Sequence, residues 1–261
     1  MKCLIINGGA SKSYLWNGAV IESFTGRLVE EVKSEMLRLG PVEFEEIRLS
    51  DVDLPYCRGC HTCFTKGERY CPHHRLISPL IEKIRGADCL ILTSPVYALN
   101  VSALVKGFFD LTAYNYHRPA FFDKKALVVS STAGGMAKRV CAYMRDTLKH
   151  WGFNRVYTLP VIRMGAPAPD GKMREKCRAA ARRFYRDAAS GKLYSPTFKR
   201  VFFYQLWRNL SLGNRESPDY TYWQESGLVK HEFSPQVKTG AAKKIFGKLV
   251  NKLLRCMMKI K

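Results

Sequence analysis

The chain has 261 residues, of which 46% are hydrophobic, enough for one large domain or for a domain with an extension. Nine cysteines, an odd number with one cluster, favour reduced intracellular thiols over a disulfide framework. The start of the chain does not resemble a secretory signal, and no apolar run reaches the roughly 18 residues of a membrane span. We therefore expect a soluble, cytoplasmic protein, or one at the membrane periphery.

Short apolar runs alternate with helical patterns along the first 165 residues. Buried strands are predicted at residues 2–7, 42–49, 88–93, 125–131 and 155–162. Helices are predicted at residues 18–39, 76–85, 101–113, 135–152 and 172–190. This alternation implies βαβ units and a doubly wound α/β fold with a five-stranded parallel sheet.

The first candidate ligand loop, residues 7–13, follows the first strand, and ligands bind at the carboxyl ends of strands in such sheets. Its candidate contacts are Gly9, Ser11, Lys12 and Ser13. Glycines, hydroxyls and one cation suit a phosphate group. Neither G-x-G-x-x-G nor a terminal G-K-[ST] is present, so a flavin monophosphate fits better than a dinucleotide or nucleoside triphosphate. Taken alone, the loop is equally well read as an ordinary Gly/Ser turn.

Two further loops follow the third and fourth predicted strands. Their candidate cofactor-binding residues are Ser94, Pro95, Val96, Tyr97 and Asn100 in one, and Thr132, Ala133, Gly134 and Gly135 in the other. A proline-stiffened turn and a pair of glycines would both let the backbone approach a flat ring. These loops are therefore compatible with a flat ring bound at the edge of the sheet.

Four cysteines, Cys57, Cys60, Cys63 and Cys71, follow the second strand with the spacing C-x2-C-x2-C-x7-C, and a proline follows the last. Ferredoxin-type motifs have a similar opening run and Cys-Pro ending, so the spacing favours an iron–sulfur cluster. Zinc held by four thiolates, or by two thiolates and two histidines, is the first alternative, and free thiols are the second. The nearby histidines are interpreted as solvated loop residues: His61, His73 and His74.

The combination of these motifs resembles the flavodoxin-like NADPH-dependent FMN reductase superfamily, and within it the iron–sulfur flavoproteins. The resemblance rests on the cysteine loop, on Ser94-Pro-Val-Tyr97 and on Ala103-x-x-Lys106-x-Phe-x-Asp110. It implies FMN held by the three loops, with phosphate contacts at Ser11, Lys12 and Ser13. The ring contacts that it implies are Pro95, Val96, Tyr97, Asn100, Thr132, Gly134 and Gly135. It also implies a 4Fe–4S cluster on the four cysteines, and a homodimer or dimer of dimers. The resemblance covers residues 1–165, including the cysteine loop at 55–75.

The sequence departs from these relatives in two places. The first loop reads Gly8-Gly-Ala-Ser-Lys-Ser13 where relatives usually have Gly-Ser-Pro-Arg-Lys. After the last cysteine, Pro72-His-His-Arg75 replaces an acidic pair. In the strand order 2-1-3-4-5, the flavin lies at the switch point between strands one and three. Strand two neighbours strand one, so the cysteine loop is predicted at the same end of the sheet.

Residues 166–261 are expected to form the closing helix and a basic, mainly helical extension. Residues 161–261 hold 22 Lys+Arg against 7 Asp+Glu. Helical patterns at 197–212 and 240–261 each have a broad apolar face. Such a lysine-rich helix either packs on a second subunit or lies on an anionic membrane surface. The charge favours an acidic electron-transfer protein such as ferredoxin, and no sequence signature indicates nucleic acid.

We therefore expect an oxidoreductase that uses FMN and a 4Fe–4S cluster. Electrons would pass from ferredoxin or NAD(P)H to a small acceptor: a quinone, a flavin, a nitro compound or an oxygen species. No side chain stands out as a nucleophile or obligatory acid or base, and electron transfer at a flavin requires none. The alternatives are a membrane-surface electron carrier with the same cofactors, and a flavin reductase without a cluster.

Overall fold

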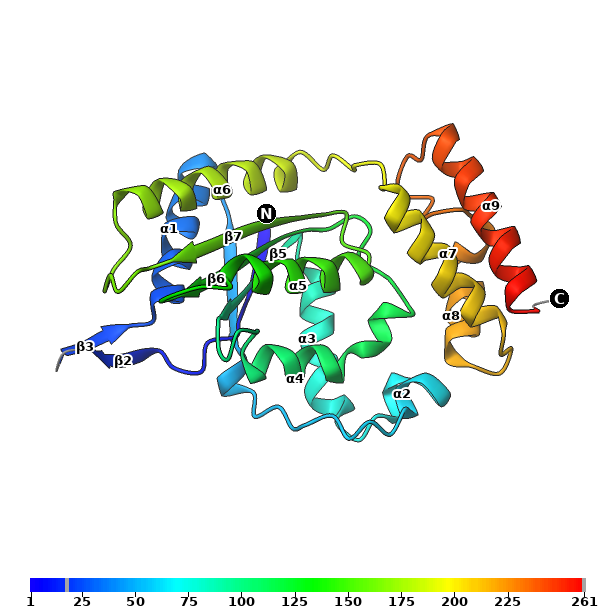
Figure 1. Cartoon of the computed structure of the whole chain (residues 1–261), viewed down its shortest axis with the longest axis horizontal. Helices are drawn as coiled ribbons and strands as arrows, with labels where there is room; N and C mark the ends of the chain where they lie inside the picture. Colours follow the sequence, from blue (N-terminus) through cyan, green and yellow to red (C-terminus); the bar gives the residue numbers. More distant parts are fainter. Residues whose placement is uncertain (17–18, 260–261) are drawn as a thin grey trace.

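The computed structural model describes residues 1–16 and 19–259 of the chain. Its centre is a five-stranded sheet in which every pair of neighbouring strands is parallel, in the order β4-β1-β5-β6-β7 (Figure 1). The strands are β1 (Lys2–Asn7), β4 (Glu43–Arg48), β5 (Cys89–Pro95), β6 (Lys125–Thr132) and β7 (Arg155–Ile162). Counted along the core, this is the order 2-1-3-4-5, so the predicted flavodoxin-like fold is confirmed.

Helices cover both faces of the sheet. On one face, α1 (Phe24–Leu39) and α6 (Gly171–Ala189) pack against alternate strand residues. The other face is covered by α3 (His74–Gly86), α4 (Ala103–Leu111) and α5 (Ala137–His150). The inner strands are buried on both faces, which is why they read as continuous apolar runs in the sequence.

The predicted helix at residues 18–39 is wrong at its start. Residues 13–16 and 19–22 instead pair as an antiparallel ribbon of β2 (Ser13–Trp16) and β3 (Ala19–Glu22), and α1 begins only at Phe24. Ser23 caps α1 by accepting a hydrogen bond from the Gly26 N–H. Val20, within the predicted helical range, instead lies on β3 and is 72% exposed. Gly18, the predicted first residue, lies outside the described residues.

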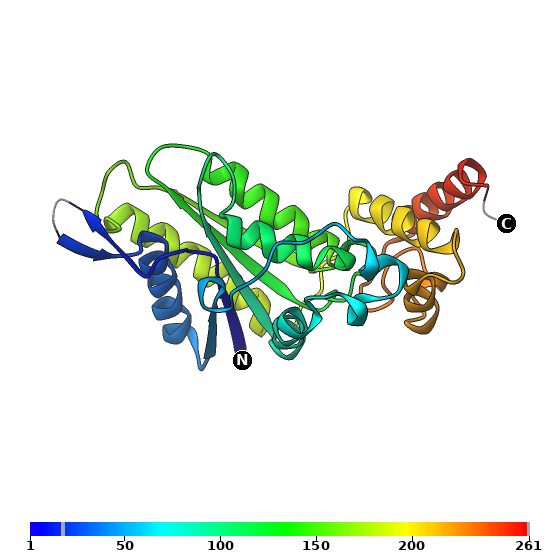
Figure 2. The same cartoon turned by 90° about the horizontal axis from the view of Figure 1, so that it is seen from below.

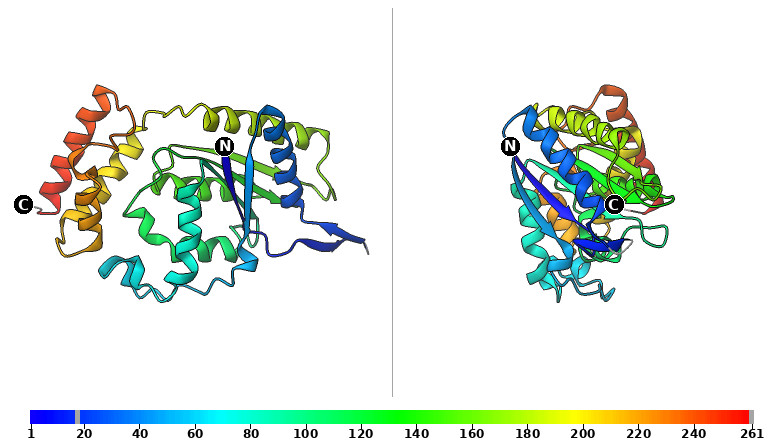
Figure 3. Two further views of the ribbon diagram at one scale, coloured as in Figure 1. Left: turned by 180° about the vertical axis from the view of Figure 1, so that it is seen from behind. Right: turned by 90° about the vertical axis from the view of Figure 1, so that its left-hand side faces the viewer.

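The chain after α6 forms a separate group of helices, α7 (Phe198–Leu212), α8 (Pro218–Glu225) and α9 (Ala241–Met257). These three helices, here called the C-terminal bundle, lie at one end of the sheet, and the β2–β3 ribbon lies at the other (Figures 1 and 2). Figure 3 shows the same separation from behind. The bundle has its own hydrophobic core, to which the sheet domain contributes Phe122. The other buried residues of this core are Val201, Tyr204, Trp223, Leu228, Phe233 and Val237.

Short helical turns connect the larger elements: η1 (Leu49–Asp51), α2 (Thr62–Thr65), η2 (Glu68–Tyr70), η3 (Ala113–Tyr116) and η4 (Leu228–Lys230). The predicted boundary between the flavodoxin-like domain and the C-terminal extension, at residue 165, stays a prediction. Helix α6, which follows this boundary, packs on α1 as part of the sheet domain. No helix in the described ranges is long and apolar enough to cross a bilayer.

Candidate functional site

The first loop is fixed against its neighbours by backbone hydrogen bonds. The Gly8 N–H donates to the Thr93 carbonyl at 3.0 Å, and the Ser102 hydroxyl donates to the Gly8 carbonyl at 2.7 Å. The Gly9 N–H donates to Asn7 Oδ1 at 2.9 Å. The loop after β1 is therefore tied to the end of β5 and to the start of α4.

Gly8 is required here by close packing. A Cβ at this position would lie 2.1 Å from Val105 Cγ2 and 2.6 Å from the Thr93 carbonyl oxygen. We expect Gly8→Ala to lower the free energy of unfolding by about 1–3 kcal/mol, because a backbone oxygen and a buried helix must both move. Urea unfolding of the flavin-free protein measures this.

Gly134→Ala is the matched control, since a Cβ at Gly134 meets nothing within 4 Å. It should leave the unfolding free energy within about 0.5 kcal/mol of wild type. Equal destabilisation by the two substitutions would contradict the packing argument.

The candidate phosphate residues lie in the turn between β1 and β2. The Ser11 hydroxyl donates to the Ser13 carbonyl, and the exposed Lys12 Nζ lies 3.9 Å from Asp51 Oδ2. The N–H of Ser23 donates to the Lys12 carbonyl at 2.8 Å. After the β2–β3 ribbon the chain therefore comes back to the first candidate loop. The start of α1 therefore borders the loop. Ser23, which was not predicted from the sequence, therefore joins the candidate phosphate contacts. A serine directly before a helix could have indicated it, because such a residue lies at the helix N-terminus.

The second and third loops lie beside each other at the carboxyl edge of the sheet. The Val96 N–H donates to the Ser131 carbonyl at 2.9 Å, and Ser94 Oγ accepts from the Ser102 N–H at 2.9 Å. Tyr97 and Asn100 exchange two backbone hydrogen bonds across a tight turn, and Tyr97 is 49% exposed. The Tyr97 ring is therefore available to a ligand.

The third loop is open. Thr132 Oγ1 accepts a hydrogen bond from the Gly134 N–H at 3.3 Å, Ala133 is exposed, and a Cβ at Gly134 or Gly135 would meet nothing within 4 Å. All three predicted loops therefore meet at one edge, as expected, and they fit a phosphate joined to a flat ring. Their individual contacts with a flavin stay predictions.

The four clustered cysteines line one small hollow together with His73, Asp110 and Leu111. Cys57 and Cys60 are exposed, while Cys63 and Cys71 are half-buried. Burial raises the pKa of the Cys63 thiol to about 11, and the neighbouring Cys71 adds to this. A hydrogen bond from the Thr62 hydroxyl lowers the pKa of Cys60. All four thiols therefore lie at a single place.

In the part of the chain that the structure describes, no three Cys, His, Asp or Glu side chains lie close enough together to hold one metal ion. Four thiolates around a single zinc ion would be about 3.8 Å apart, given Zn–S bonds of about 2.3 Å in a tetrahedron. A four-iron cluster holds its thiolates farther apart. Four thiols at one place suit either an iron–sulfur cluster or a zinc ion, and the choice between them belongs to the proposed function.

The cysteine hollow lies farther from the flavin loops than the topology predicted. The cysteine loop does leave the carboxyl end of β4. However, Asp110 and Leu111 at the end of α4 line the hollow. The first two candidate flavin loops instead contact Ser102, at the start of α4. Nine residues of α4 correspond to about 13 Å. Residues 52–61 form no helix or strand and carry the chain below α4 to α2 (Figure 1).

Residues missed by the sequence analysis hold the cysteine loop against the C-terminal bundle. The buried Arg118 donates to the Cys63 carbonyl at 2.5 Å and contacts Glu68, and its Nε lies 3.0 Å from Asp219 Oδ1. Those last two atoms form an ion pair without an aligned hydrogen bond. His117 Nδ1 lies 2.7 Å from the other Asp219 oxygen. An unusual buried Arg-Asp pair thus joins α8 to the cysteine loop.

A row of three rings in contact lies beside this ion pair. The Phe64 ring lies 4.5 Å from that of His117, which lies 4.4 Å from the Trp207 indole on α7. Of the three histidines predicted to be solvated, only His61 is exposed. His73 lines the hollow, with Nε2 buried and without a hydrogen-bond partner among the described residues, and His74 is half-buried.

Comparison with known proteins gives the following similarities. The sequence model of the family described as NADPH-dependent FMN reductase matches residues 1–164. Over 111 residues the chain is 38% identical to an iron-sulfur flavoprotein of Archaeoglobus fulgidus, covering 42% of this chain and 50% of that protein. Over 89 residues it is 37% identical to an iron-sulfur flavoprotein of Methanocaldococcus jannaschii, covering 34% and 45%. The chain spans about half the length of the curated relatives it matches.

Solved structures share the fold at lower identity. The NAD(P)H:quinone oxidoreductase from Methanothermobacter marburgensis has a TM-score of 0.54 and 21% identity, over 72% of this chain and 97% of that one. The apo form of an NADH:FMN oxidoreductase has a TM-score of 0.51 and 19% identity, over 76% and 93%. At these identities the likeness shows the fold alone.

Proposed function

Because the chain belongs to the NADPH-dependent FMN reductase family, we propose that it is an FMN-dependent oxidoreductase that passes electrons from ferredoxin or NAD(P)H to a small acceptor. Quinones, flavins, nitro compounds and oxygen species are the acceptor classes considered. The observation that carries the proposal is the meeting of three loops at the carboxyl edge of β1, β5 and β6. This edge is where doubly wound sheets bind their ligands.

The chain's own residues would bind and orient the cofactor. In this proposal Gly9, Ser11, Lys12 and Ser13, with Ser23, hold the phosphate, and the glycines of the third loop admit the ring edge. Tyr97 covers part of the ring and excludes water there. When bound, FMN accepts or gives one or two electrons, so the protein needs no nucleophile of its own.

The same proposal includes a 4Fe–4S cluster on Cys57, Cys60, Cys63 and Cys71. Two observations support it: the four thiols line one hollow, and the curated relatives are iron-sulfur flavoproteins. A cluster transfers one electron at a time, whereas a flavin can transfer one or two. The cluster would therefore exchange single electrons with the flavin. Zinc and free thiols are the competing outcomes.

Anaerobic purification followed by iron and sulfide assays and a visible spectrum tests the cofactors. We expect about four irons per chain and a broad absorbance added to that of the flavin. Cys57→Ala and Cys71→Ala should each remove the broad absorbance and leave FMN bound. Cys256→Ala, an exposed cysteine on α9, is the control and should change neither. A flavin spectrum without iron would leave a flavin reductase.

The partners of the oxidoreductase are also part of the proposal. The net charge of +21 favours an acidic donor such as ferredoxin over a basic one. Assembly as a homodimer or dimer of dimers stays a prediction. Both are tested by the salt dependence of ferredoxin-driven reduction and by light scattering of the purified protein.

A second candidate function is electron transfer at an anionic membrane surface, and the outer face of α9 favours it. Four apolar side chains at four-residue intervals are 60–70% exposed: Ile245, Leu249, Leu253 and Met257. The opposite side, with Val250 and Leu254, is buried against the bundle. Helix α9 contains basic but no acidic residues, and each lysine near anionic lipid contributes about 1 kcal/mol.

Sedimentation with phosphatidylcholine vesicles, with and without phosphatidylserine, tests this candidate. We expect binding only with phosphatidylserine, and loss of binding in high salt and in the Leu249→Glu/Leu253→Glu double variant. Leu37→Glu, at an exposed leucine on α1, is the control. If wild type binds no vesicle and the double variant instead turns a dimer into a monomer, the face is covered by a second copy.

A further inference from the structure

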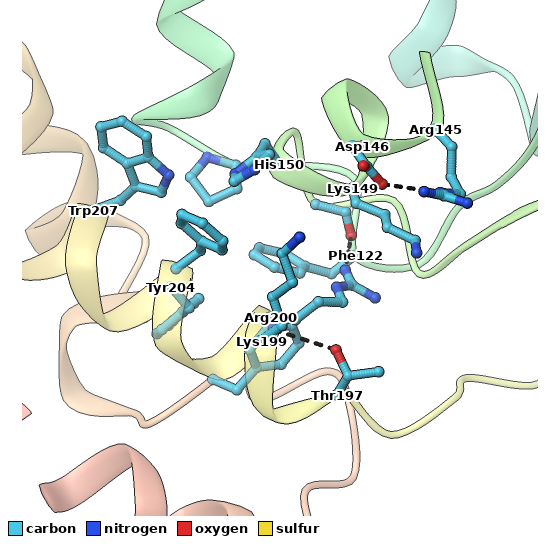
Figure 4. A pocket seen from close by; sticks show the side chains of 14 residues that line it. Phe122, Arg145, Asp146, Lys149, His150, Thr197, Lys199, Arg200, Tyr204 and Trp207 are labelled. Atoms are coloured by element: carbon cyan, nitrogen blue, oxygen red, sulfur yellow. Dashed lines mark hydrogen bonds and ion pairs between the residues drawn. The ribbon is translucent and has the colours of Figure 1, made fainter. Parts of the chain in front are cut away.

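A cavity of about 370 Å³ lies between the sheet domain and the C-terminal bundle (Figure 4). Its walls come from the end of α5, from Pro119 and Phe122 before β6, from the first turns of α7, and from Phe233. Gly152, which also lines it, precedes the amino end of β7. The flavin loops follow the carboxyl ends of strands, so the cavity is at the opposite end of the sheet.

The cavity carries more positive charge than its own acid neutralises. Its basic lining residues are Arg145, Lys149, Lys199 and Arg200, and its one carboxylate belongs to Asp146. Arg145 Nε already donates to Asp146 at 2.9 Å. No carboxylate of the described residues lies within 4 Å of the cationic nitrogens of Lys149, Lys199 or Arg200. Within the described ranges, Lys149, Lys199 and Arg200 therefore form no ion pair, and Asp146, which already pairs with Arg145, is the one carboxylate of the lining near the two lysines.

Arg200 is held in place but not neutralised. Its guanidinium donates to the carbonyls of Asn154 at 2.8 Å and Gly152 at 2.9 Å, and lies 5.3 Å from the centre of the Phe233 ring. Arg200 and Lys199 are in the first turn of α7, where the helix dipole disfavours cations. Burial lowers the pKa of Lys149, and Arg145 lowers it further. An anion in the cavity would relieve this repulsion.

The remaining wall is aromatic and contains a donor without a partner. Phe122, Phe203, Tyr204 and Trp207 all line the cavity. The Trp207 indole nitrogen is buried and forms no hydrogen bond with the described residues, and in Figure 4 it lies on the ring edge turned toward His150. Flat rings and a spare N–H suit a planar ligand with an acceptor group.

We propose that this cavity binds a small aromatic anion, a planar ring bearing a carboxylate or phosphate, at a site separate from the flavin. The negative group lies among Lys149, Lys199 and Arg200, and the ring lies against Phe203 and Trp207. Trp207 stacks on His117, and the His117 ring makes a tilted contact with Phe64, so the ligand contacts the end of a row of rings that reaches the cysteine loop.

Calorimetric titration of the purified, flavin-loaded, full-length protein with 2-naphthoate tests the site. The neutral isostere 2-naphthamide and inorganic phosphate are titrated in parallel. We expect saturable naphthoate binding, about tenfold tighter than that of the amide or phosphate. The flavin spectrum should not change during the titration.

The Lys149→Gln/Lys199→Gln double variant should weaken naphthoate binding about tenfold while leaving amide binding unchanged. Lys248→Gln on α9, outside the cavity, is the matched control, and thermal unfolding confirms that both variants fold. Absence of saturable binding, equal affinity for the acid and the amide, equal binding by the double variant, or a perturbed flavin spectrum would each overturn the proposal.

Discussion

Replacement of Arg118 by methionine is expected to lower the free energy of unfolding by about 3 kcal/mol and to loosen the cysteine loop. The guanidinium is buried, and it joins the Cys63 carbonyl, Glu68 and Asp219. Methionine fills much of the space but leaves the buried Asp219 carboxylate with His117 alone. The loss of a buried charge partner, rather than of volume, therefore sets the cost.

Two measurements separate loop loosening from general destabilisation. Urea unfolding gives the free energy. If the proposed cluster is bound, the rate at which a chelator removes its iron from the folded protein in the absence of urea reports on the loop. Arg85→Met, which removes an exposed pair with Glu82, is the control and should cost less than about 1 kcal/mol. If the two variants release iron at the same rate, Arg118 does not hold the loop.

The sequence predicted the sheet because its signals are local. Buried parallel strands read as apolar runs, and the residues predicted for the last strand, 155–162, are the bounds of β7. The order of the strands followed from the resemblance and is confirmed. Helix α9 was predicted at 240–261, and the structure gives Ala241–Met257, while residues 260 and 261 lie outside the described part.

The start of α1 was mispredicted because two periodicities overlap. Val20 and Ile21 fit the apolar face of a continuing helix, but β-branched residues also favour strands. The pair Asn17-Gly18 between apolar residues is a strong sequence signal for a hairpin. The serine that caps α1 was present in the sequence, and it marks the true start of the helix.

The contacts between the cysteine loop and the C-terminal bundle were not predictable from the sequence. Arg118 and Asp219 are about a hundred positions apart, and neither belongs to a motif. The same holds for the cavity, whose basic residues come from α5 and α7. Net charge revealed that the second part of the chain is basic, but only the packing of α7 against α5 places those cations together.

The second large effect is expected for Trp223→Ala, which should destabilise the C-terminal bundle by about 3–5 kcal/mol. Trp223 is fully buried in the bundle core, its ring packs edge-on to Tyr204 at 4.9 Å, and its indole N–H donates to the His117 carbonyl at 2.8 Å. The substitution leaves a cavity in a core of few side chains. It also leaves the His117 carbonyl without that partner.

Because Trp223 contacts the sheet domain through His117, its loss tests whether the bundle unfolds separately. Limited proteolysis of the variant should cut within residues 190–259 while the sheet domain keeps the proposed FMN, since the three candidate flavin loops lie at the other end of the sheet. Trp223→Phe keeps an aromatic ring but loses the N–H and part of the indole volume, so it should cost less than Trp223→Ala, about 1–3 kcal/mol. Simultaneous loss of bundle and flavin in Trp223→Ala would mean that the two parts fold as one unit. The contacts of His117 and Arg118 would then be the reason, because through them the bundle supports the cysteine loop.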